Sequence, residues 1–160
     1  FRSCGNFGDP TKDCSCSPPK IQSYLGKISG PLLDRIDIHV EVPAVKYEEL
    51  SSKRVGESSK TIRERVVKAR QVQQKRFENS HSFKNADMSS QEIKTFCELD
   101  EKSQNLMKMA MTKLGLSARA YDRILKVSRT IADLEASDKI QITHISEAIQ
   151  YRSLDREYWK

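Results

Sequence analysis

Long apolar runs are missing from this sequence of 160 residues. A transmembrane helix needs about 20 consecutive apolar residues, and no stretch of the chain approaches that length. The first residues also lack the basic and apolar regions of a secretory signal peptide. We therefore expect a cytoplasmic protein that has no membrane partner.

A phosphate-binding loop of the Gly-x-x-x-x-Gly-Lys-Ser/Thr type is also absent, as is an acidic strand end that could hold Mg²⁺. Such a loop supplies the backbone N–H groups that hold the phosphates of a nucleotide. The sequence begins within an irregular segment rich in Gly, Cys and Asp. We therefore expect the C-terminal fragment of a longer protein, which does not hydrolyse nucleotides by itself.

The residues that are present have a polar but foldable composition, 37% apolar and 31% charged, with a net charge of +6. Nine basic and two acidic residues lie between positions 51 and 76, which gives this segment a charge of +7. The other 19 basic and 20 acidic residues give −1. Because the excess of positive charge is confined to one segment, it favours an anionic partner.

Apolar residues recur at intervals of three and four over most of the chain, which predicts amphipathic helices. We expect helices at about 19–28, 58–78, 89–97, 100–114, 117–135 and 143–151. Ser89 with Glu92 forms a capping-box pattern, Ser117 and Thr143 are suitable N-caps, and Gly115 is suitable as a helix end.

The last four of these helices are expected to form a compact bundle. Its expected core consists of Phe96, Leu106, Met111, Leu114, Tyr121, Ile124, Leu125, Ile131, Leu134, Ile145 and Ile149. In the helix at about 117–135, the helical period predicts a solvent-facing side opposite the core. The charged residues expected on that side are Arg119, Arg123, Lys126 and Asp133.

A different pattern follows Gly30 and Pro31, which are expected to end the first helix. The chain then alternates between apolar and polar residues, with apolar side chains at Ile36, Ile38, Val40 and Val42. A period of two with β-branched residues predicts a half-buried strand, and Pro43 would end it.

Two dense motifs and a closing segment carry a family resemblance. Residues 32–37 read Leu-Leu-Asp-Arg-Ile-Asp, and residues 115–125 read Gly-Leu-Ser-Ala-Arg-Ala-Tyr-Asp-Arg-Ile-Leu. In this order, and with residues 149–156 at the end, they resemble the magnesium-chelatase branch of the AAA+ ATPases, in particular the competence protein ComM family and its YifB-like relatives. The resemblance covers nearly the whole chain, from Cys4 to Arg156.

The resemblance implies roles for three arginines. Arg35 is at the place of the arginine finger, which reaches across a subunit boundary to the γ-phosphate of the neighbour. Arg119 is at the place of the sensor-2 arginine, which faces the nucleotide phosphates. Arg123, one turn later on the same face, is a second candidate. A guanidinium suits both tasks because its planar fork of donors matches phosphate oxygens.

The function that the resemblance implies is a ring-forming ATPase motor, expected to be a homohexamer that uses ATP and Mg²⁺ and acts on DNA in recombination during natural transformation. Two alternatives stay open. One is a magnesium-chelatase motor subunit that acts on a protein partner, and the other is a non-catalytic adaptor that binds nucleic acid or protein. Without the resemblance, an Asp34–Arg35 pair that caps a strand fits residues 34 and 35 equally well, and two solvent-facing arginines are the preferred interpretation of Arg119 and Arg123.

Three of the four cysteines, Cys4, Cys14 and Cys16, fall in the N-terminal loop. Thiolates at such short spacings can converge on Zn²⁺, so these residues are candidate ligands of a structural zinc ion. A closed zinc site takes four ligands. The related family has a further cysteine where this sequence has Arg2, and free cysteines in a reducing compartment are therefore the alternative.

The predicted helix at about 58–78 combines a narrow apolar stripe with most of the basic residues. The narrow stripe predicts packing along one side only. The candidate contacts to nucleic acid on its other faces are Lys60, Arg63, Lys68 and Arg70. The alternative is an ordinary solvated face, because no groove-reading motif accompanies these residues.

Together these features predict a mainly α fold, namely the helical lid bundle of an AAA+ C-terminal region with an N-terminal remnant of the AAA+ core that contains one short strand. We divide the chain into the end of the core at 1–45, a linker with the basic helix at 46–83, the lid domain at 84–154 and a tail at 155–160. Since the remnant has lost the sheet that its strand would join, we expect residues 1–45 to be poorly ordered, swapped between chains or folded back onto the lid.

Overall fold

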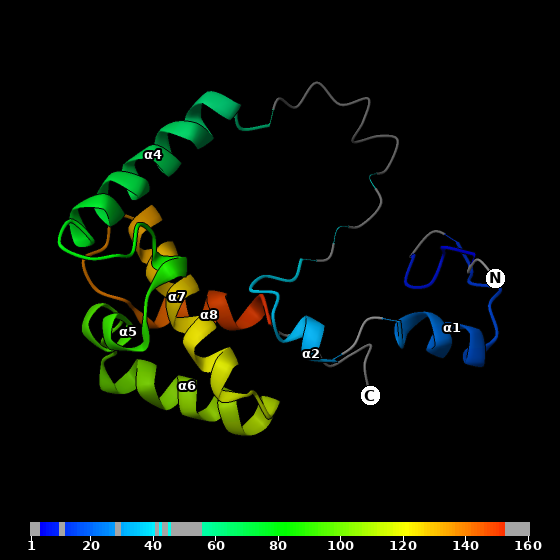
Figure 1. The fold of residues 1–160 in the computed structure, drawn as a ribbon. Coiled ribbons are helices and arrows are strands. Elements are labelled where there is room, and N and C mark those ends of the chain that lie inside the picture. The colour runs from blue at the N-terminus through cyan, green and yellow to red at the C-terminus, as the bar shows by residue number, and fades with distance from the viewer. Residues whose placement is uncertain are drawn as a thin grey trace.

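The computed structural model describes residues 4–9, 12–27, 30–40, 42, 45 and 56–152 of the chain. Within these ranges the fold is mainly helical, which confirms the predicted class (Figure 1). The elements in chain order are α1 (Pro18–Leu25), α2 (Gly30–Leu33), α4 (Ser59–Arg76), the 3₁₀ helix η1 (Asn85–Asp87), α5 (Ser90–Phe96), α6 (Glu101–Leu114), α7 (Ala118–Leu134) and α8 (Ile142–Gln150). None of the described helices is long and apolar enough to cross a membrane.

Helix α7 forms the centre of the bundle because it is strongly amphipathic. Its buried apolar side chains include Ile124, Leu125, Ile131 and Ala132, and they pack in one cluster with Met107 of α6. Helix α7 contacts α4, η1, α5 and α8, while α6 contacts α8. Figure 1 shows the N-terminal end of α4 running out from this bundle. Removal of this apolar surface from water is the main driving force for assembling the bundle.

Local capping interactions set the starts of α5 and α7. The hydroxyl of Ser89 accepts a hydrogen bond from the backbone N–H of Glu92 (3.3 Å), and the Glu92 carboxylate accepts one from the N–H of Ser89 (2.7 Å). This arrangement is the predicted capping box. Ser117 caps α7 by accepting from the N–H of Ala120 (3.1 Å), and Gly115 ends α6 with a left-handed φ of 52°.

The start of α8 differs from the prediction, because Gln141 and not Thr143 is the N-cap. The backbone N–H of Gln141 donates to Nδ1 of His144 (3.0 Å), and Nε2 of His144 lies 2.9 Å from a carboxylate oxygen of Glu135. A buried histidine therefore joins the start of α8 to the end of α7. The helix therefore begins at a local cap formed by Gln141 and His144, in place of the predicted Thr143 cap.

A buried ionic network joins α4 to α7. The guanidinium of Arg76 donates to both carboxylate oxygens of Asp133, at 2.5 and 2.7 Å. Arg129 and the side-chain amide of Asn85 also donate to Asp133, at 3.1 and 2.8 Å. The Asp133 side chain has no exposed area, so the prediction that it faces solvent is wrong. The carboxylate is buried because Arg76, 57 residues earlier in the chain, takes the place of water.

Two residues of the predicted core are more exposed than expected. Tyr121 is 38% exposed and Leu134 is 37% exposed. Both lie in the end turns of α7, where the neighbouring helices cover less of its surface. The other predicted core residues are buried or partly buried, namely Phe96, Leu106, Met111, Leu114, Ile124, Leu125, Ile131, Ile145 and Ile149.

The predicted strand from residue 36 onward is not formed in the part of the chain that the structure describes. Ile36, Ile38 and Val40 are 41, 49 and 64% exposed, and residues 41 and 43 lie outside the described ranges. A strand needs a neighbouring strand to pair its backbone groups. Here the segment makes isolated hydrogen bonds instead, such as that from the N–H of His39 to the carbonyl of Tyr151 (2.9 Å).

Candidate functional site

The segment at residues 30–40 lies against the start of α7 and the end of α8 (Figure 1). Its principal anchor is the carboxylate of Asp34. The hydroxyl of Ser117 donates to Oδ1 of Asp34 at 2.9 Å, and Nη1 of Arg119 donates to Oδ2 at 3.1 Å. Arg152, just after α8, places Nη2 3.6 Å from Oδ1. One carboxylate therefore connects the 32–37 motif with the N-terminus of α7 and the C-terminal end of the bundle.

The environment of Asp34 keeps this carboxyl group ionised. Desolvation alone would raise its pKa, but the hydrogen bonds from Ser117 and Arg119 outweigh that effect. The positive charges of Arg119 and Arg152 act in the same direction as these hydrogen bonds. The pKa of Asp34 is therefore lowered from its ordinary value, and the contact is one between charged groups at neutral pH.

A second ion pair follows along the same contact, between Arg123 and Asp37. Arg119 and Arg123 are one helical turn apart, so the segment sets one aspartate against each of two successive turns of α7. Their side chains are 57% and 25% exposed. Both predicted sensor arginines thus reach the surface, and each is paired with a carboxylate of its own chain that a phosphate group would have to replace.

Arg152 is a site residue to which the sequence analysis gave no role. Its side chain is only 2% exposed and donates to the backbone carbonyl of Ile36 as well as lying beside Asp34. The available signal was its position in the closing segment 149–156, of which residues 153–156 lie outside the described part of the chain. Arg152 thus holds the 30–40 segment at the C-terminal end of the bundle, through Asp34 and the carbonyl of Ile36.

The predicted finger residue, Arg35, differs from the other arginines of the site. Its backbone N–H closes a turn on the carbonyl of Leu32 (3.0 Å), and its side chain is exposed. Asp34 bonds to Ser117, Arg119 and Arg152, so the structure does not form the alternative Asp34–Arg35 pair. Among the described residues no acidic side chain forms an ion pair with Arg35, and its guanidinium can meet a partner from outside the chain.

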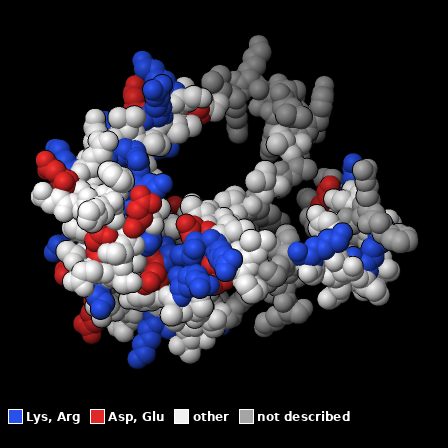
Figure 2. All heavy atoms as spheres, viewed as in Figure 1, with Lys and Arg blue, Asp and Glu red and all other residues white. Residues whose placement is uncertain are grey.

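Helix α4 presents the predicted nucleic-acid residues on its solvent side. It packs on the bundle through Ala69, Gln73 and Phe77 near its C-terminal end. The exposed basic residues are Lys60, Arg63, Lys68 and Arg70, whereas Arg65 forms a two-bond ion pair with Glu57 (3.0 and 3.2 Å). Figure 2 shows basic side chains gathered on the end of α4 that projects from the bundle.

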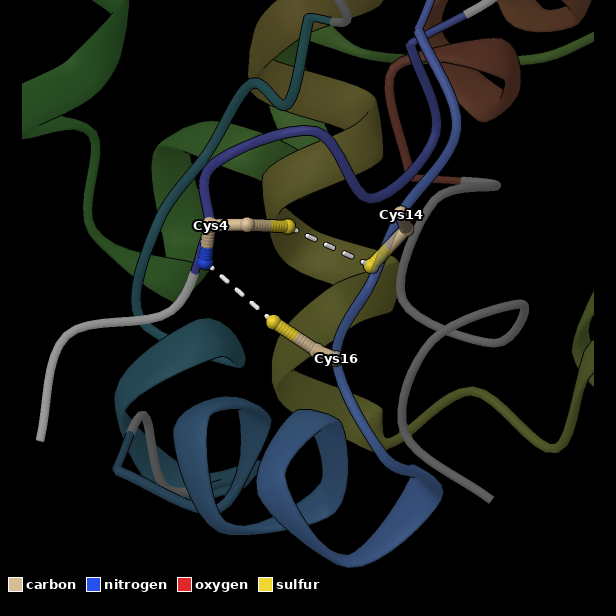
Figure 3. Close-up of side chains that lie close together, drawn as sticks. All are labelled: Cys4, Cys14 and Cys16. Carbon is tan, nitrogen blue, oxygen red and sulfur yellow. Dashed lines mark hydrogen bonds between the residues drawn. The ribbon is translucent and has the colours of Figure 1, made fainter.

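The three loop cysteines converge at a separate place, next to the start of α1 (Figure 3). The Sγ atoms of Cys4 and Cys14 are 3.5 Å apart, and the backbone N–H of Cys4 donates to Sγ of Cys16 at 3.2 Å. All three Sγ atoms lie within 4.8 Å of one another. The fourth cysteine, Cys97, is buried in the bundle, where desolvation raises its pKa to about 11.

The pKa values of Cys4 and Cys14 move in opposite directions. The N–H of Asn6 and then the thiols of Cys16 and Cys14 lower the pKa of Cys4 to about 6. The N–H of Cys16 would lower the pKa of Cys14, but desolvation and the two neighbouring thiols together raise it. Cys4 therefore becomes a thiolate, the form that binds metals, at a lower pH than Cys14 does.

Comparison with known proteins identifies the family. Residues 56–152 match the family described as magnesium chelatase, subunit ChlI C-terminal, and residues 2–50 match the family described as magnesium chelatase, subunit ChlI. Similar proteins include Competence protein ComM of Haemophilus influenzae, 44% identical over 141 residues, and YifB of Escherichia coli, 43% identical over 142 residues. YifB of Salmonella typhimurium is 39% identical over 142 residues. Each of the three alignments covers 88% of this chain.

The first family match alone extends over more than half of the chain. The chain therefore belongs to the magnesium-chelatase ChlI-type family of AAA+ proteins, and within it to the ComM/YifB-like group. It spans 27% of the length of these curated relatives, so what a whole relative does is carried over to this chain only as a proposal.

Proposed function

We propose that this chain is the C-terminal part of a ring-forming AAA+ ATPase motor that acts on DNA in the recombination of natural transformation. Membership of the family supports the ATPase, and the similarity to a protein named Competence protein ComM supports the link to transformation. The observation that carries the proposal is the exposed guanidinium of Arg35 beside an Asp34 that is anchored to α7.

In the proposed ring, Arg35 extends into the nucleotide site of the neighbouring subunit. There, water attacks the γ-phosphorus of ATP while the bond to the β,γ-bridging oxygen breaks, and negative charge is redistributed over the phosphate oxygens. A guanidinium that is already in position stabilises this charge without reorganisation. The anchored Asp34 and the turn of α2 supply that positioning.

Arg119 and Arg123 act on the nucleotide of their own subunit in this mechanism. A phosphate group that approaches the start of α7 competes with Asp34 for Arg119, which is the more exposed of the two arginines. Exchange of the carboxylate for a phosphate loosens the contact between α7 and the 30–40 segment, which also carries Arg35. Nucleotide binding in one subunit is thereby coupled to the position of the finger that serves the next.

The sequence has no phosphate loop, so ATP and Mg²⁺ need further residues of the full-length protein. When bound, Mg²⁺ would neutralise part of the phosphate charge. The arginines of this chain would add contacts to a nucleotide site whose phosphate loop comes from other residues of the full-length protein. ATP turnover is accordingly expected from full-length rings.

The test compares full-length protein with Arg35→Ala, Arg35→Lys and the control Arg65→Ala, which removes an exposed arginine paired with Glu57. We expect Arg35→Ala to lower kcat by about 10³-fold or more, as is found when an arginine finger is missing, with nucleotide affinity retained. Arg35→Lys should restore little of the ATPase activity, because an ammonium group lacks the planar fork of donors that a guanidinium has. Normal turnover in Arg35→Ala would overturn the finger assignment.

A second candidate is a magnesium-chelatase-type motor that acts on a protein partner. Both family descriptions name a magnesium chelatase subunit, which favours this candidate. The hydrolysis step and its arginines are the same in the two cases. Stimulation of ATP turnover distinguishes them, since added DNA should accelerate a DNA motor and leave a chelatase-type motor unchanged. A non-catalytic adaptor would bind its partner without any ATP turnover in the full-length protein.

A further inference from the structure

We propose that Cys4, Cys14 and Cys16 form a trithiolate zinc site whose fourth coordination position is open to water or to a donor from another molecule. The site lies in the N-terminal loop before α1 and is separate from the arginines that the ATPase proposal uses. The zinc site therefore goes beyond the proposed function, and neither proposal depends on the other.

The spacing of the sulfur atoms fits a single tetrahedral ion. With Zn–S bonds of about 2.3 Å, two sulfurs on a tetrahedral zinc ion are about 3.8 Å apart. The Cys4–Cys14 distance of 3.5 Å is close to this value, and no pair of the three Sγ atoms exceeds 4.8 Å. Small side-chain rotations suffice to give all three distances, because the chain has already brought Cys4 to the other two cysteines across 10 and 12 residues.

The backbone around the cluster is arranged to stabilise thiolates. The N–H of Asn6 donates to Sγ of Cys4 (3.4 Å), and the N–H of Cys4 donates to Sγ of Cys16 (3.2 Å). Gly5, between Cys4 and Asn6, has a φ of 83°, a conformation that favours glycine. An added Cβ would meet no atom within 4 Å, so the requirement for glycine at this position is conformational. Outer-shell donors of this kind orient metal ligands and tune their basicity.

Three observations point to an open fourth position. Among the described residues, no His, Asp, Glu or further Cys joins the cluster of three thiols. Cys97, the remaining cysteine, is buried in the helical bundle. Cys4 is exposed and its two partners are partly exposed, so a fourth ligand can enter from solvent. Sites with three protein ligands and one exchangeable ligand are the usual form of an open zinc centre.

The first test is titration of the reduced 160-residue chain with Co²⁺, which substitutes for Zn²⁺ and gives charge-transfer absorption when bound by thiolates. One equivalent should saturate the absorption, and Zn²⁺ should abolish it by displacing Co²⁺. Addition of imidazole or 2-mercaptoethanol should change the visible Co²⁺ spectrum, because these donors replace water at the fourth position. If neither donor alters the spectrum, the proposal of an open fourth position is wrong.

The second test uses variants. Cys4→Ser, Cys14→Ser and Cys16→Ser should each weaken binding at least as much as the loss of an outer-shell group, which typically costs about 10- to 100-fold. Gly5→Ala, which keeps all three thiols, should also weaken binding by disturbing the N–H donors. Ser15→Ala is the matched control because it keeps the thiols and the backbone donors of the loop. Circular dichroism shows whether each variant keeps its helices.

Two results would overturn the zinc site. One is the absence of thiolate charge-transfer absorption in the reduced wild-type chain. The other is binding that survives Cys4→Ser and Cys14→Ser unchanged in chains whose helices are intact. A Cys4–Cys14 disulfide that forms and resists reduction in the presence of Zn²⁺ would likewise contradict the site, since the two sulfurs would then be unavailable to the ion.

Discussion

At the scale of single residues, burial separates arginines that the sequence alone presents as alike. Arg35 is exposed, Arg119 is 57% exposed and paired with Asp34, and Arg152 is 2% exposed. A guanidinium in water can meet an incoming phosphate, whereas a buried one has to satisfy its donors within the chain. In the proposed mechanism Arg35 and Arg119 are therefore the residues available for ligand contacts, whereas the buried Arg152 holds the 30–40 segment.

We predict that Arg152→Ala destabilises the chain whereas Arg35→Ala does not. Arg152 donates to the carbonyl of Ile36 and lies beside Asp34, and loss of charged hydrogen bonds of this kind costs about 1.5–3 kcal/mol. Arg35→Ala should change the free energy of unfolding by less than about 0.5 kcal/mol, as is usual at exposed positions. Urea unfolding followed by circular dichroism measures both, and equal effects would contradict the difference in burial.

At the scale of elements, the basic helix is attached to the bundle by charge as much as by apolar contact. Arg76 at the end of α4 and Arg129 of α7 share the buried carboxylate of Asp133, and the Asn85 amide completes its hydrogen bonds. Burial of Arg129 lowers the pKa of its guanidinium, although the charge of Asp133 opposes this change. The orientation of α4 on α7 therefore depends on this carboxylate as well as on the packing of Ala69 and Phe77.

Asp133→Ala should lower the free energy of unfolding by about 3–5 kcal/mol, because it leaves two guanidinium groups without their buried partner. The control is Glu78→Ala, at an exposed position just beyond the end of α4. Chemical unfolding of the three chains gives the comparison. A cost for Asp133→Ala no larger than that for Glu78→Ala would show that the network does not hold α4 to α7.

The cap of α5 should make stability depend on acidity. Hydrogen bonds from Ser80, then from the backbone and side chain of Ser89, lower the pKa of Glu92 to about 2. Because the pKa is lower in the folded chain than the ordinary value of 4.5, the carboxylate stabilises the fold above about pH 4.5. This contribution is lost as the pH falls towards 2.

We predict that Glu92→Gln is less stable than wild type at pH 6 and that the difference shrinks between pH 4.5 and 2. Thermal unfolding at a series of pH values measures the difference. Glu101→Gln, at an exposed position in the first turn of α6, is the control for losing one surface carboxylate. A difference that is constant over this pH range would mean that the Glu92 carboxylate is not specially stabilised.

The features that could be predicted from the sequence are those that depend on neighbouring residues. The Ser89–Glu92 capping box, the Ser117 cap and the end of α6 at Gly115 involve contacts within a few positions, and the helices follow from their apolar period. The burial of Asp133 could not be predicted in this way, because its partner Arg76 is 57 residues distant.

The same distinction holds for the candidate site. The spacing of Arg119 and Arg123 predicted that both lie on one side of α7. Their partners, Asp34 and Asp37, could not be predicted in this way, because Asp34 lies 85 residues before Arg119 in the chain. The alternation from residue 36 predicted a strand, although a strand also requires a neighbour that a local pattern does not specify. Long-range partners, rather than local preferences, account for what the sequence analysis missed.

At the scale of the whole molecule, three surfaces with different chemistry can be distinguished. The exposed face of α4 is basic, the contact between the 30–40 segment and α7 combines both signs, and the cysteine loop lies before α1 (Figures 1 and 2). Only the first offers unpaired positive charge along an extended helix among the described residues. A nucleic-acid partner would therefore contact α4 and leave the arginines of the proposed ATPase site available.

We predict that the 160-residue chain binds duplex DNA at low salt through α4. Each phosphate contact contributes about 0.9 to the slope of log K against log salt concentration. A variant with Gln at Lys60, Arg63, Lys68 and Arg70 should have a slope smaller by up to about 4. The charge-matched control has Gln at four exposed lysines elsewhere, Lys94, Lys102, Lys108 and Lys139. Equal loss in both variants would mean that only the net charge matters.

The most direct measurement is the ATPase rate of full-length rings assembled from wild-type and Arg35→Ala subunits in varied proportions. If Arg35 serves the neighbouring site, the rate falls as the variant is added, and each wild-type subunit loses activity when its neighbour lacks the guanidinium. Rings mixed with Arg65→Ala should keep the wild-type rate. If rings made only of Arg35→Ala subunits hydrolyse ATP at the wild-type rate, or if adding the variant leaves the activity of the wild-type subunits unchanged, the arginine does not act across the subunit boundary.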